Sequence, residues 1–228
     1  MESVIPISRR SLHDEVVERV RAMLIEGQIA PGSKLNEREL CQLLHVSRTP
    51  LREAIKRLAS EGLVDLLPNR GAVAVRLSEA DVLSAFEVLA ELEGMSGQLA
   101  AERMTAEELA QVQTLHHEML ASFERRDLHN YYRFNAQIHA AVNRAAKNPL
   151  LTKTYREINA RVQSLRFKTN QNEAKWTRSV AEHEQMVSLL KARDAAGMRA
   201  LLVEHLLCKR DTVLEQMRLI ALAQRGVA

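Results

Sequence analysis

Three histidines in the second half of the sequence fall on the apolar stripes of three segments with helical periodicity. They are His139, His183 and His205, and each stripe should face the interior of a helical bundle. A buried polar group without a partner costs roughly 1–3 kcal/mol, so three converging imidazoles need a shared partner. A divalent transition metal is the simplest one, because imidazole nitrogen suits Zn, Ni, Cu and Fe and three histidines with a water recur at zinc sites. Asn135, four residues before His139, is placed to add an oxygen ligand.

Two other interpretations of these histidines stay open on the pattern alone. In the first, each imidazole makes its own hydrogen bond in the core, which the pattern favours about as much as a metal. In the second, an open three-histidine site activates water in a metal-dependent enzyme built on a helical bundle. Such an enzyme needs a general base, and Glu182 and Glu184 flank His183 but should point off its face. We therefore expect no enzymatic activity.

A second set of residues suits contact with DNA. The segment from Ser47 has the sequence SRTPLREAIKRLASEG, in which Arg48 and Arg52 are four apart and share one helical face. The arginine donor fork matches O6 and N7 of guanine in the major groove. The hydroxyls of Ser47 and Thr49, with the amides at the helix N-terminus, suit phosphate.

Two further arginines extend this surface beyond the predicted recognition helix. Arg38 begins the preceding short helix, where it could reach a base or a phosphate, and Arg70 lies at a predicted hairpin tip, near the minor groove. The formal net charge of +3 does not by itself indicate nucleic acid. A solvated face with routine charges, or a helix-turn-helix that contacts protein, is the alternative.

The elements that carry the arginines predict a winged helix-turn-helix. Caps and glycine stops bound three helices that end near Gly27, Leu44 and Gly62, and two short strands at 63–67 and 72–77 follow, with a turn at 68–71. Three helices and a hairpin in fewer than 80 residues is the pattern of that fold.

Everything after this hairpin is predicted to be helical. Six helices are expected, starting near 78, 105, 127, 149, 178 and 195, with a polar loop at 170–177. They indicate a bundle. The sequence thus predicts a mainly α protein with a DNA-binding domain at 1–77 and an all-helical domain at 78–228.

Composition narrows the class of protein. Hydrophobic residues make up 46% of the 228 residues, and only 8 Gly and 5 Pro interrupt them, which favours long helices. No apolar run approaches the roughly 18 residues of a membrane span, and the start of the chain lacks the apolar core of a signal peptide. The two cysteines, Cys41 and Cys208, fit a reducing compartment. We expect a cytoplasmic protein without membrane association.

The first half resembles a known family of bacterial repressors. LNERELCQLLHVSRTPLREAIKRLASEGLVDLLPNRGAVAV, from Leu35 to Val75, is similar to the winged-helix signature of the GntR family. The resemblance implies a homodimer on a short palindromic DNA operator. Carried over by position, it implies DNA contacts from these residues: Arg38, Arg48, Thr49, Arg52, Arg70 and Gly71.

The second half, from Asp81 to about Leu222, resembles the ligand-sensing FCD domain of the FadR-like subfamily. The similar segments are NAQIHAAVNRAAKNPLL and EHEQMVSLLKARDAAGMRALLVEHL. The resemblance implies a metal, Zn or Ni, held by Asn135, His139, His183 and His205, and a small carboxylate effector. Asn135 stands where the family has Asp, and Leu89 stands where many relatives have Arg, four before Glu93.

Two arginines fit the basic positions of the family after the NPLL segment. They are Arg161 and Arg166; Arg161 could clamp the carboxylate of an effector, or it is a surface arginine with a buried stem. The sequence therefore predicts a transcriptional regulator, a repressor, whose operator affinity is controlled by an organic acid bound at a metal. A DNA-binding regulator with a purely structural metal is the alternative.

Overall fold

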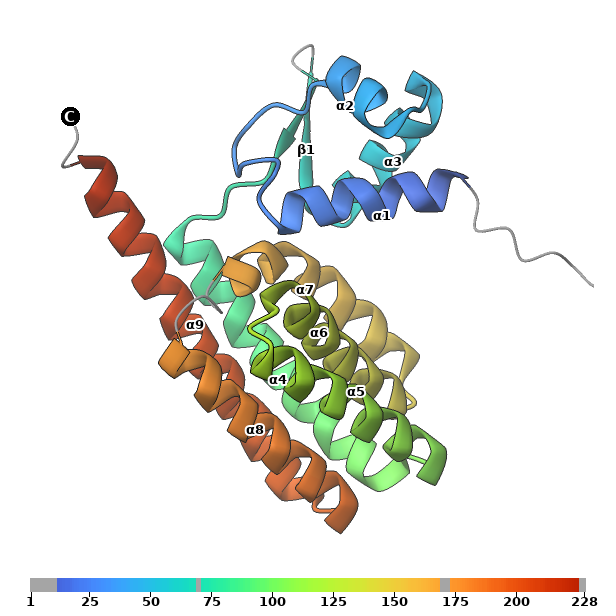
Figure 1. Ribbon diagram of the computed structural model, residues 1–228, viewed down its shortest axis with the longest axis vertical. Coiled ribbons are helices and arrows are strands. Elements are labelled where there is room, and N and C mark those ends of the chain that lie inside the picture. Colours follow the sequence, from blue (N-terminus) through green and yellow to red (C-terminus); the bar gives the residue numbers. More distant parts are fainter. Residues whose placement is uncertain (1–11, 69–70, 169–172, 226–228) are drawn as a thin grey trace, which may run out of the picture. The chain divides into compact units, whose positions relative to one another are not determined.

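The computed structural model describes residues 12–68, 71–168 and 173–225. These residues form two compact units, of which the first ends at Arg76 and the second begins at Leu77 (Figure 1). Each unit is described by itself. Within the described ranges no helix combines the length and the apolar character needed to span a membrane.

The first unit is a winged helix-turn-helix (Figure 1). Its elements are α1 (Leu12–Ile25), α2 (Glu37–Leu44), α3 (Arg48–Ser60), β1 (Val64–Leu67) and β2 (Gly71–Ala74). The strands pair antiparallel, with Val64 opposite Ala74 and Leu67 opposite Gly71. The core between α1 and α3 contains Val17, Val20, Leu51 and Leu58, all fully buried.

Local capping sets the angle between α2 and α3. The side chain of Asn36 accepts hydrogen bonds from the backbone N–H groups of Arg38 and Glu39, at 3.1 and 3.4 Å, and so starts α2. His45 ends α2 in the left-handed region, at a φ of 53°. The N–H of Val46 donates to the carbonyl of Cys41, so the chain turns within a few residues and α3 can begin directly.

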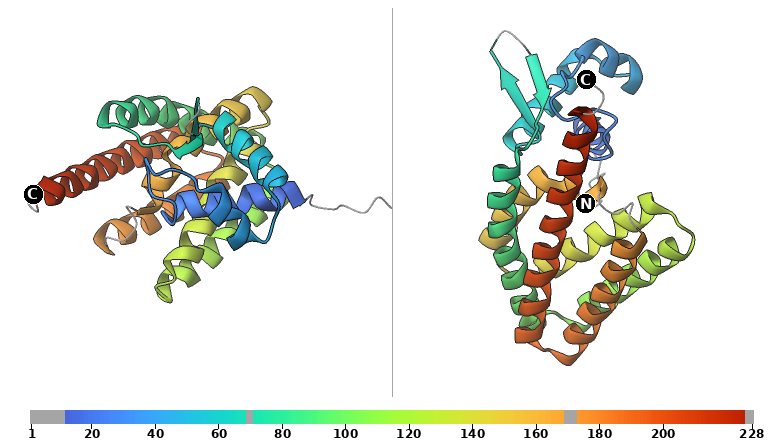
Figure 2. Two further views of the ribbon diagram at one scale, coloured as in Figure 1. Left: turned by 90° about the horizontal axis from the view of Figure 1, so that it is seen from above. Right: turned by 90° about the vertical axis from the view of Figure 1, so that its left-hand side faces the viewer.

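The second unit is an all-helical bundle (Figure 2). Its elements are α4 (Glu79–Arg103), α5 (Ala106–Glu124), α6 (Leu128–Ala145), α7 (Pro149–Lys168), α8 (Glu173–Ala192) and α9 (Ala195–Arg225). Two reciprocal capping boxes, Ser78 with Asp81 and Thr105 with Glu108, start α4 and α5. Helices α4 and α9 run side by side over much of their length.

The structure corrects one of the expected boundaries. A polar loop was expected over 170–177, but α8 begins at Glu173, so residues 173–177 are helical. The segment contains good helix formers such as Glu173 and Ala174. Trp176 anchors it, because its indole ring is 9% exposed and packs edge-on against Phe123 and Tyr131 with centroids 5.0 Å apart.

Two glycines allow α4 and α9 to approach each other closely. A Cβ on Gly97 would lie 2.5 Å from Leu202 Cδ1 and 3.2 Å from Met198 Cε. A Cβ on Gly94 would lie 2.6 Å from Val203 Cγ2. All three distances are below van der Waals contact, so a Cβ at either position would require the facing side chains of α9 to move.

Replacing Gly97 by Ala should therefore destabilise the bundle. Alanine in a helix interior ordinarily stabilises by about 0.5–1 kcal/mol relative to glycine, whereas overpacking costs about 1–3 kcal/mol. We expect Gly97→Ala to lower the free energy of unfolding in urea by about 1–3 kcal/mol, the cost of overpacking. Ser84→Ala, at an exposed position of the same helix, is the control and should change it by less than about 0.5 kcal/mol. A Gly97→Ala variant more stable than the parent would contradict the close approach.

Candidate metal centre and nucleic-acid interface

The three histidines predicted from the sequence meet in the interior of the bundle. His139 comes from α6, His183 from α8 and His205 from α9, and their exposed fractions are 4%, 0% and 6%. The ring centroids are 5.2 Å apart for His139 and His183, 5.4 Å for His139 and His205, and 5.3 Å for His183 and His205. One ligand nitrogen of each ring lies within 4.8 Å of the other two.

Each of the three rings has an oxygen partner at its Nδ1 atom. Glu93 Oε2 lies 2.7 Å from Nδ1 of His139. The Nδ1 of His183 lies 2.7 Å from the carbonyl oxygen of Ser179, and Glu182 Oε2 lies 2.5 Å from Nδ1 of His205. The contacts of His183 and His205, and the carboxylate beside His139, favour a proton on Nδ1, which would leave the lone pair of each ring on Nε2. Acceptors of this kind orient histidines that bind metals through the other nitrogen.

The Nε2 atoms are the unsatisfied side of the cluster. Those of His139 and His183 are buried and have no hydrogen-bond partner among the residues that the structure describes. Burial lowers the pKa of His183 well below its usual value, and the neighbouring imidazoles lower it further. Burial also lowers the pKa of His205, although Glu182 opposes the shift. Imidazole nitrogens buried this close together suit a shared cation, and the donor set fits a divalent transition metal.

Two acidic residues hold the histidines, and sequence reasoning missed both roles. Glu93 is 3% exposed on α4. Glu182 was expected to point away from the histidine face, and this was wrong, because it contacts His205 on the neighbouring helix α9. Burial raises the pKa of Glu182, but its hydrogen bonds with His205 and Arg178 outweigh burial and lower it overall. Glu182 is therefore a carboxylate that orients His205.

Asn135 is buried, with 6% of its surface exposed, one helical turn before His139 on α6. The spacing of four places the two side chains on the same face of the helix. Its carbonyl oxygen as a fourth ligand stays a prediction.

Of the two arginines predicted to bind an effector, the structure describes the side chain of Arg161 only. Arg161 is exposed on α7. Hydrogen bonds with Ser78 lower the pKa of Asp81 most, and the charge of Arg161 adds to them, so Arg161 acts near the start of α4. Glu93 lies about 18 Å further along that helix. The side chain of Arg166 lies outside the described residues, and effector binding by both arginines stays a prediction.

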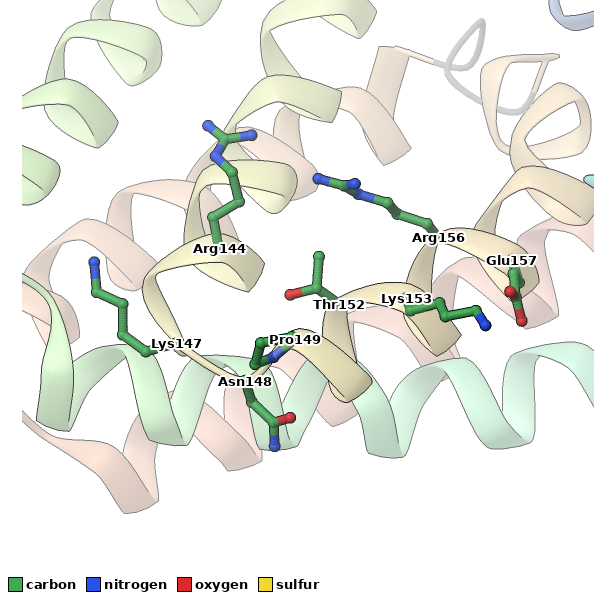
Figure 3. Close-up of a pocket in the computed structure, with 8 residues that line it drawn as sticks. All are labelled: Arg144, Lys147, Asn148, Pro149, Thr152, Lys153, Arg156 and Glu157. Carbon is green, nitrogen blue, oxygen red and sulfur yellow. The ribbon is translucent and has the colours of Figure 1, made fainter.

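An open pocket of about 550 Å³ lies where α6 leads into α7 (Figure 3). Its lining is mainly cationic and consists of Arg144, Lys147, Asn148, Pro149, Thr152, Lys153, Arg156 and Glu157. Lys147 forms an ion pair with Glu108. None of the three histidines lines this pocket, so it is separate from the candidate metal centre.

The predicted DNA-contacting residues of α3 lie on its exposed N-terminal face. Arg48, Thr49 and Arg52 are all exposed, and buried Leu51 and Ile55 hold the opposite face in the core. Ser47 occupies the N-cap position, but its side chain makes no capping hydrogen bond. The hydroxyl and the first amides of α3 are therefore available to a phosphate.

Two further features concern the surface around α3: the residues before and after this helix, and the partner of Arg52. Arg38 is exposed at the start of α2. Arg52 donates from Nε to Glu37 Oε2 at 2.9 Å, so it has an intramolecular partner in this structure. Gly71 begins β2 with a φ of 83°, a left-handed conformation that favours glycine. Arg70 lies outside the described residues.

Comparisons with known proteins agree with both halves of this geometry. Residues 12–73 match the model of the bacterial regulatory proteins of the gntR family, and residues 84–207 match the model of the FCD domain. The chain belongs to the GntR family of bacterial regulators and carries an FCD domain. It is 31% identical over 201 residues to the Nta operon transcriptional regulator of Aminobacter aminovorans, covering 86% of this chain and 91% of that protein.

More distant relatives of this GntR-family chain have the same organisation. The HTH-type transcriptional repressor RspR of Escherichia coli is 25% identical over 195 residues, which cover 86% of each chain. The solved structure of E. coli McbR/YncC superposes with a TM-score of 0.82 at 24% identity, over 92% of this chain and 100% of that one. The protein is a DNA-binding transcriptional regulator of the GntR/FCD type, and its relatives are regulators and not enzymes.

Arg48→Ala should weaken sequence-specific DNA binding. Loss of a bidentate contact with guanine costs about 1–3 kcal/mol, or roughly 5- to 150-fold in Kd. The affinity of the full-length protein would be measured for a duplex selected from a random pool and for a scrambled duplex. Arg19→Ala removes the same charge from the exposed face of α1 and is the control. Equal losses in the two variants, or equal losses on both duplexes, would argue against base reading by Arg48.

Proposed function

We propose that this regulator binds a divalent transition metal, Zn or Ni, at His139, His183 and His205, with Asn135 as the fourth ligand. The observation that supports this proposal best is that each ring has an oxygen at its Nδ1 atom and keeps its Nε2 atom for a metal. All three Nδ1 atoms have an oxygen partner at 2.5–2.7 Å, which leaves three Nε2 atoms for one ion. Separate core hydrogen bonds would not leave the Nε2 atoms of two buried rings without partners.

We further propose that a small organic acid binds at this centre. The bound metal would supply a Lewis-acidic position for a carboxylate oxygen. Three histidines and a neutral amide are a weaker set than four strong protein ligands, so a carboxylate oxygen could replace the amide or a water on the ion. A site of four strong protein ligands, by contrast, is typical of structural zinc.

Regulation requires that the acid binds two states of the protein differently. We propose a homodimer on a palindromic operator, in which the acid changes the pose of the paired DNA-binding units and so the operator affinity. The name of the relative RspR, a transcriptional repressor, supports repression as the default. Such a regulator of bacterial genes acts in the cytoplasm.

A purely structural metal is the second candidate. The full burial of the cluster supports it, because His183 has no exposed surface. In that case removal of the metal would lower the melting temperature, but no acid would raise the melting temperature of the loaded protein.

Glu182→Gln should weaken metal binding although Glu182 is not a ligand. The amide can still accept from Nδ1 of His205 but carries no charge, and loss of such partners typically costs 10- to 100-fold in metal affinity. Competition with a chromogenic chelator would give the Kd for Zn²⁺. Glu184→Gln makes the same change two residues away at an exposed position and should leave the Kd unchanged. Zn²⁺ affinity that is equal in both variants would count against the orienting role.

Small carboxylates should stabilise the protein only when the metal is present. A ligand at 100 times its Kd adds about 2.7 kcal/mol to stability, which thermal-shift screening detects readily. The screen would compare zinc-loaded and chelated protein, and an acid that raises the melting temperature would then be tested on operator affinity. Stabilisation that is the same with and without metal, or an unchanged operator affinity, would contradict the sensing function.

A further inference from the structure

A pair of aromatic donors lies on the same helices as the metal-binding histidines. Tyr131 on α6 is fully buried, and Trp176 on α8 is 9% exposed. Their rings meet edge to face with centroids 5.0 Å apart. Tyr131 precedes His139 by eight residues and Trp176 precedes His183 by seven, so both lie about two helical turns, or about 11–12 Å, along the helix from the centre.

Both polar atoms of this aromatic pair lack a partner. Tyr131 Oη and Trp176 Nε1 are buried and make no hydrogen bond with any described residue. The Ser179 and Trp176 side chains are near enough to the Tyr131 hydroxyl to oppose the rise of its pKa, but neither meets the geometry of a hydrogen bond with it. Buried donors are almost always satisfied in native proteins by protein, ordered water or ligand, so two neighbouring exceptions indicate a missing acceptor.

The chemistry of the pair defines the acceptor. An indole N–H only donates. Burial raises the pKa of Tyr131 to about 12, so its hydroxyl keeps its proton at neutral pH and can donate as well. Two neutral donors side by side suit one oxygen of a carboxylate or a carbonyl group.

Polar groups lie between the donor pair and the histidines on both α6 and α8. Asn135 lies one turn from Tyr131 and one turn from His139, on the same face of α6, and it is buried. On α8, Ser179 lies beside the Tyr131 hydroxyl, and its carbonyl oxygen lies 2.7 Å from Nδ1 of His183. A ligand that reaches from the metal to the donors would therefore pass polar groups on both helices.

We propose that Tyr131 and Trp176 form a second recognition point of the effector site. The inference rests on the proposed function, in which one acid group binds the metal. The effector is then an organic acid with a second oxygen acceptor at its far end, and the donor pair selects for its length. Monocarboxylates occupy only the metal end.

The experiment uses Trp176, the single tryptophan of the chain, as an internal probe. Zinc-loaded full-length protein would be titrated with dicarboxylates from succinate to suberate and with monocarboxylates of the same carbon numbers. Calorimetry gives the Kd, and tryptophan emission reports contact at the donor pair. We expect one chain length to change the emission and to bind about tenfold more tightly than its monocarboxylate, the gain typical of a hydrogen bond to a charged group.

Tyr131→Phe should abolish this advantage of about tenfold while acetate binds as before. Because the hydroxyl has no partner without ligand, the variant should melt at the parent temperature or above it, which separates lost recognition from misfolding. Tyr132→Phe is the matched control, since that hydroxyl donates to the Gln163 carbonyl at 3.0 Å; it should keep the preference for dicarboxylates. Trp176→Phe, measured by calorimetry, should behave like Tyr131→Phe.

The outcomes distinguish this inference from the proposed function. Equal affinities for dicarboxylates and monocarboxylates, or a Tyr131→Phe variant that keeps the dicarboxylate advantage, would overturn the donor pair and leave the metal centre standing. Failure of the protein to bind Zn²⁺, or binding of acetate that does not depend on zinc, would overturn the proposed function and this inference with it.

Discussion

The bundle is organised around a cluster of imidazoles that cannot satisfy one another. Three buried imidazoles from α6, α8 and α9 surround a shared centre, while oxygens of Glu93, Ser179 and Glu182 lie against their Nδ1 atoms. Such an arrangement is unfavourable without a positive charge, because buried acceptors lose their hydration and gain no donor. Four helices must be correctly placed to hold the rings in this way, because Glu93 comes from α4 and the histidines come from α6, α8 and α9.

Sequence periodicity found the centre because each histidine lies on an otherwise apolar stripe. It also predicted helices that start near 78 and 105, where the capping boxes of Ser78 with Asp81 and of Thr105 with Glu108 lie. Both signals are local, since they depend on residues within a few turns of one helix. The winged helix-turn-helix and the bundle that follows it were predictable for the same reason.

The residues that sequence reasoning missed act across helices. Glu182 lies next to His183 in the chain but contacts His205, and no spacing rule predicts a partner 23 residues away. Trp176 was hidden in an expected polar loop, because its neighbours along the chain are polar while Phe123 and Tyr131, which bury it, are distant in sequence. Leu43 continues the apolar pattern of α2 but is 63% exposed, so the pattern of one helix does not show which apolar side chains a neighbour covers.

The ion pair between Arg52 and Glu37 has a consequence for how the protein finds its operator. An arginine already bound to a carboxylate must exchange that partner for a base, and the exchange is favourable only where the base offers a well-aligned pair of acceptors. If Arg52 reads a base, as its position in α3 predicts, Glu37 would compete with that base for the guanidinium and so favour release from duplexes that lack it.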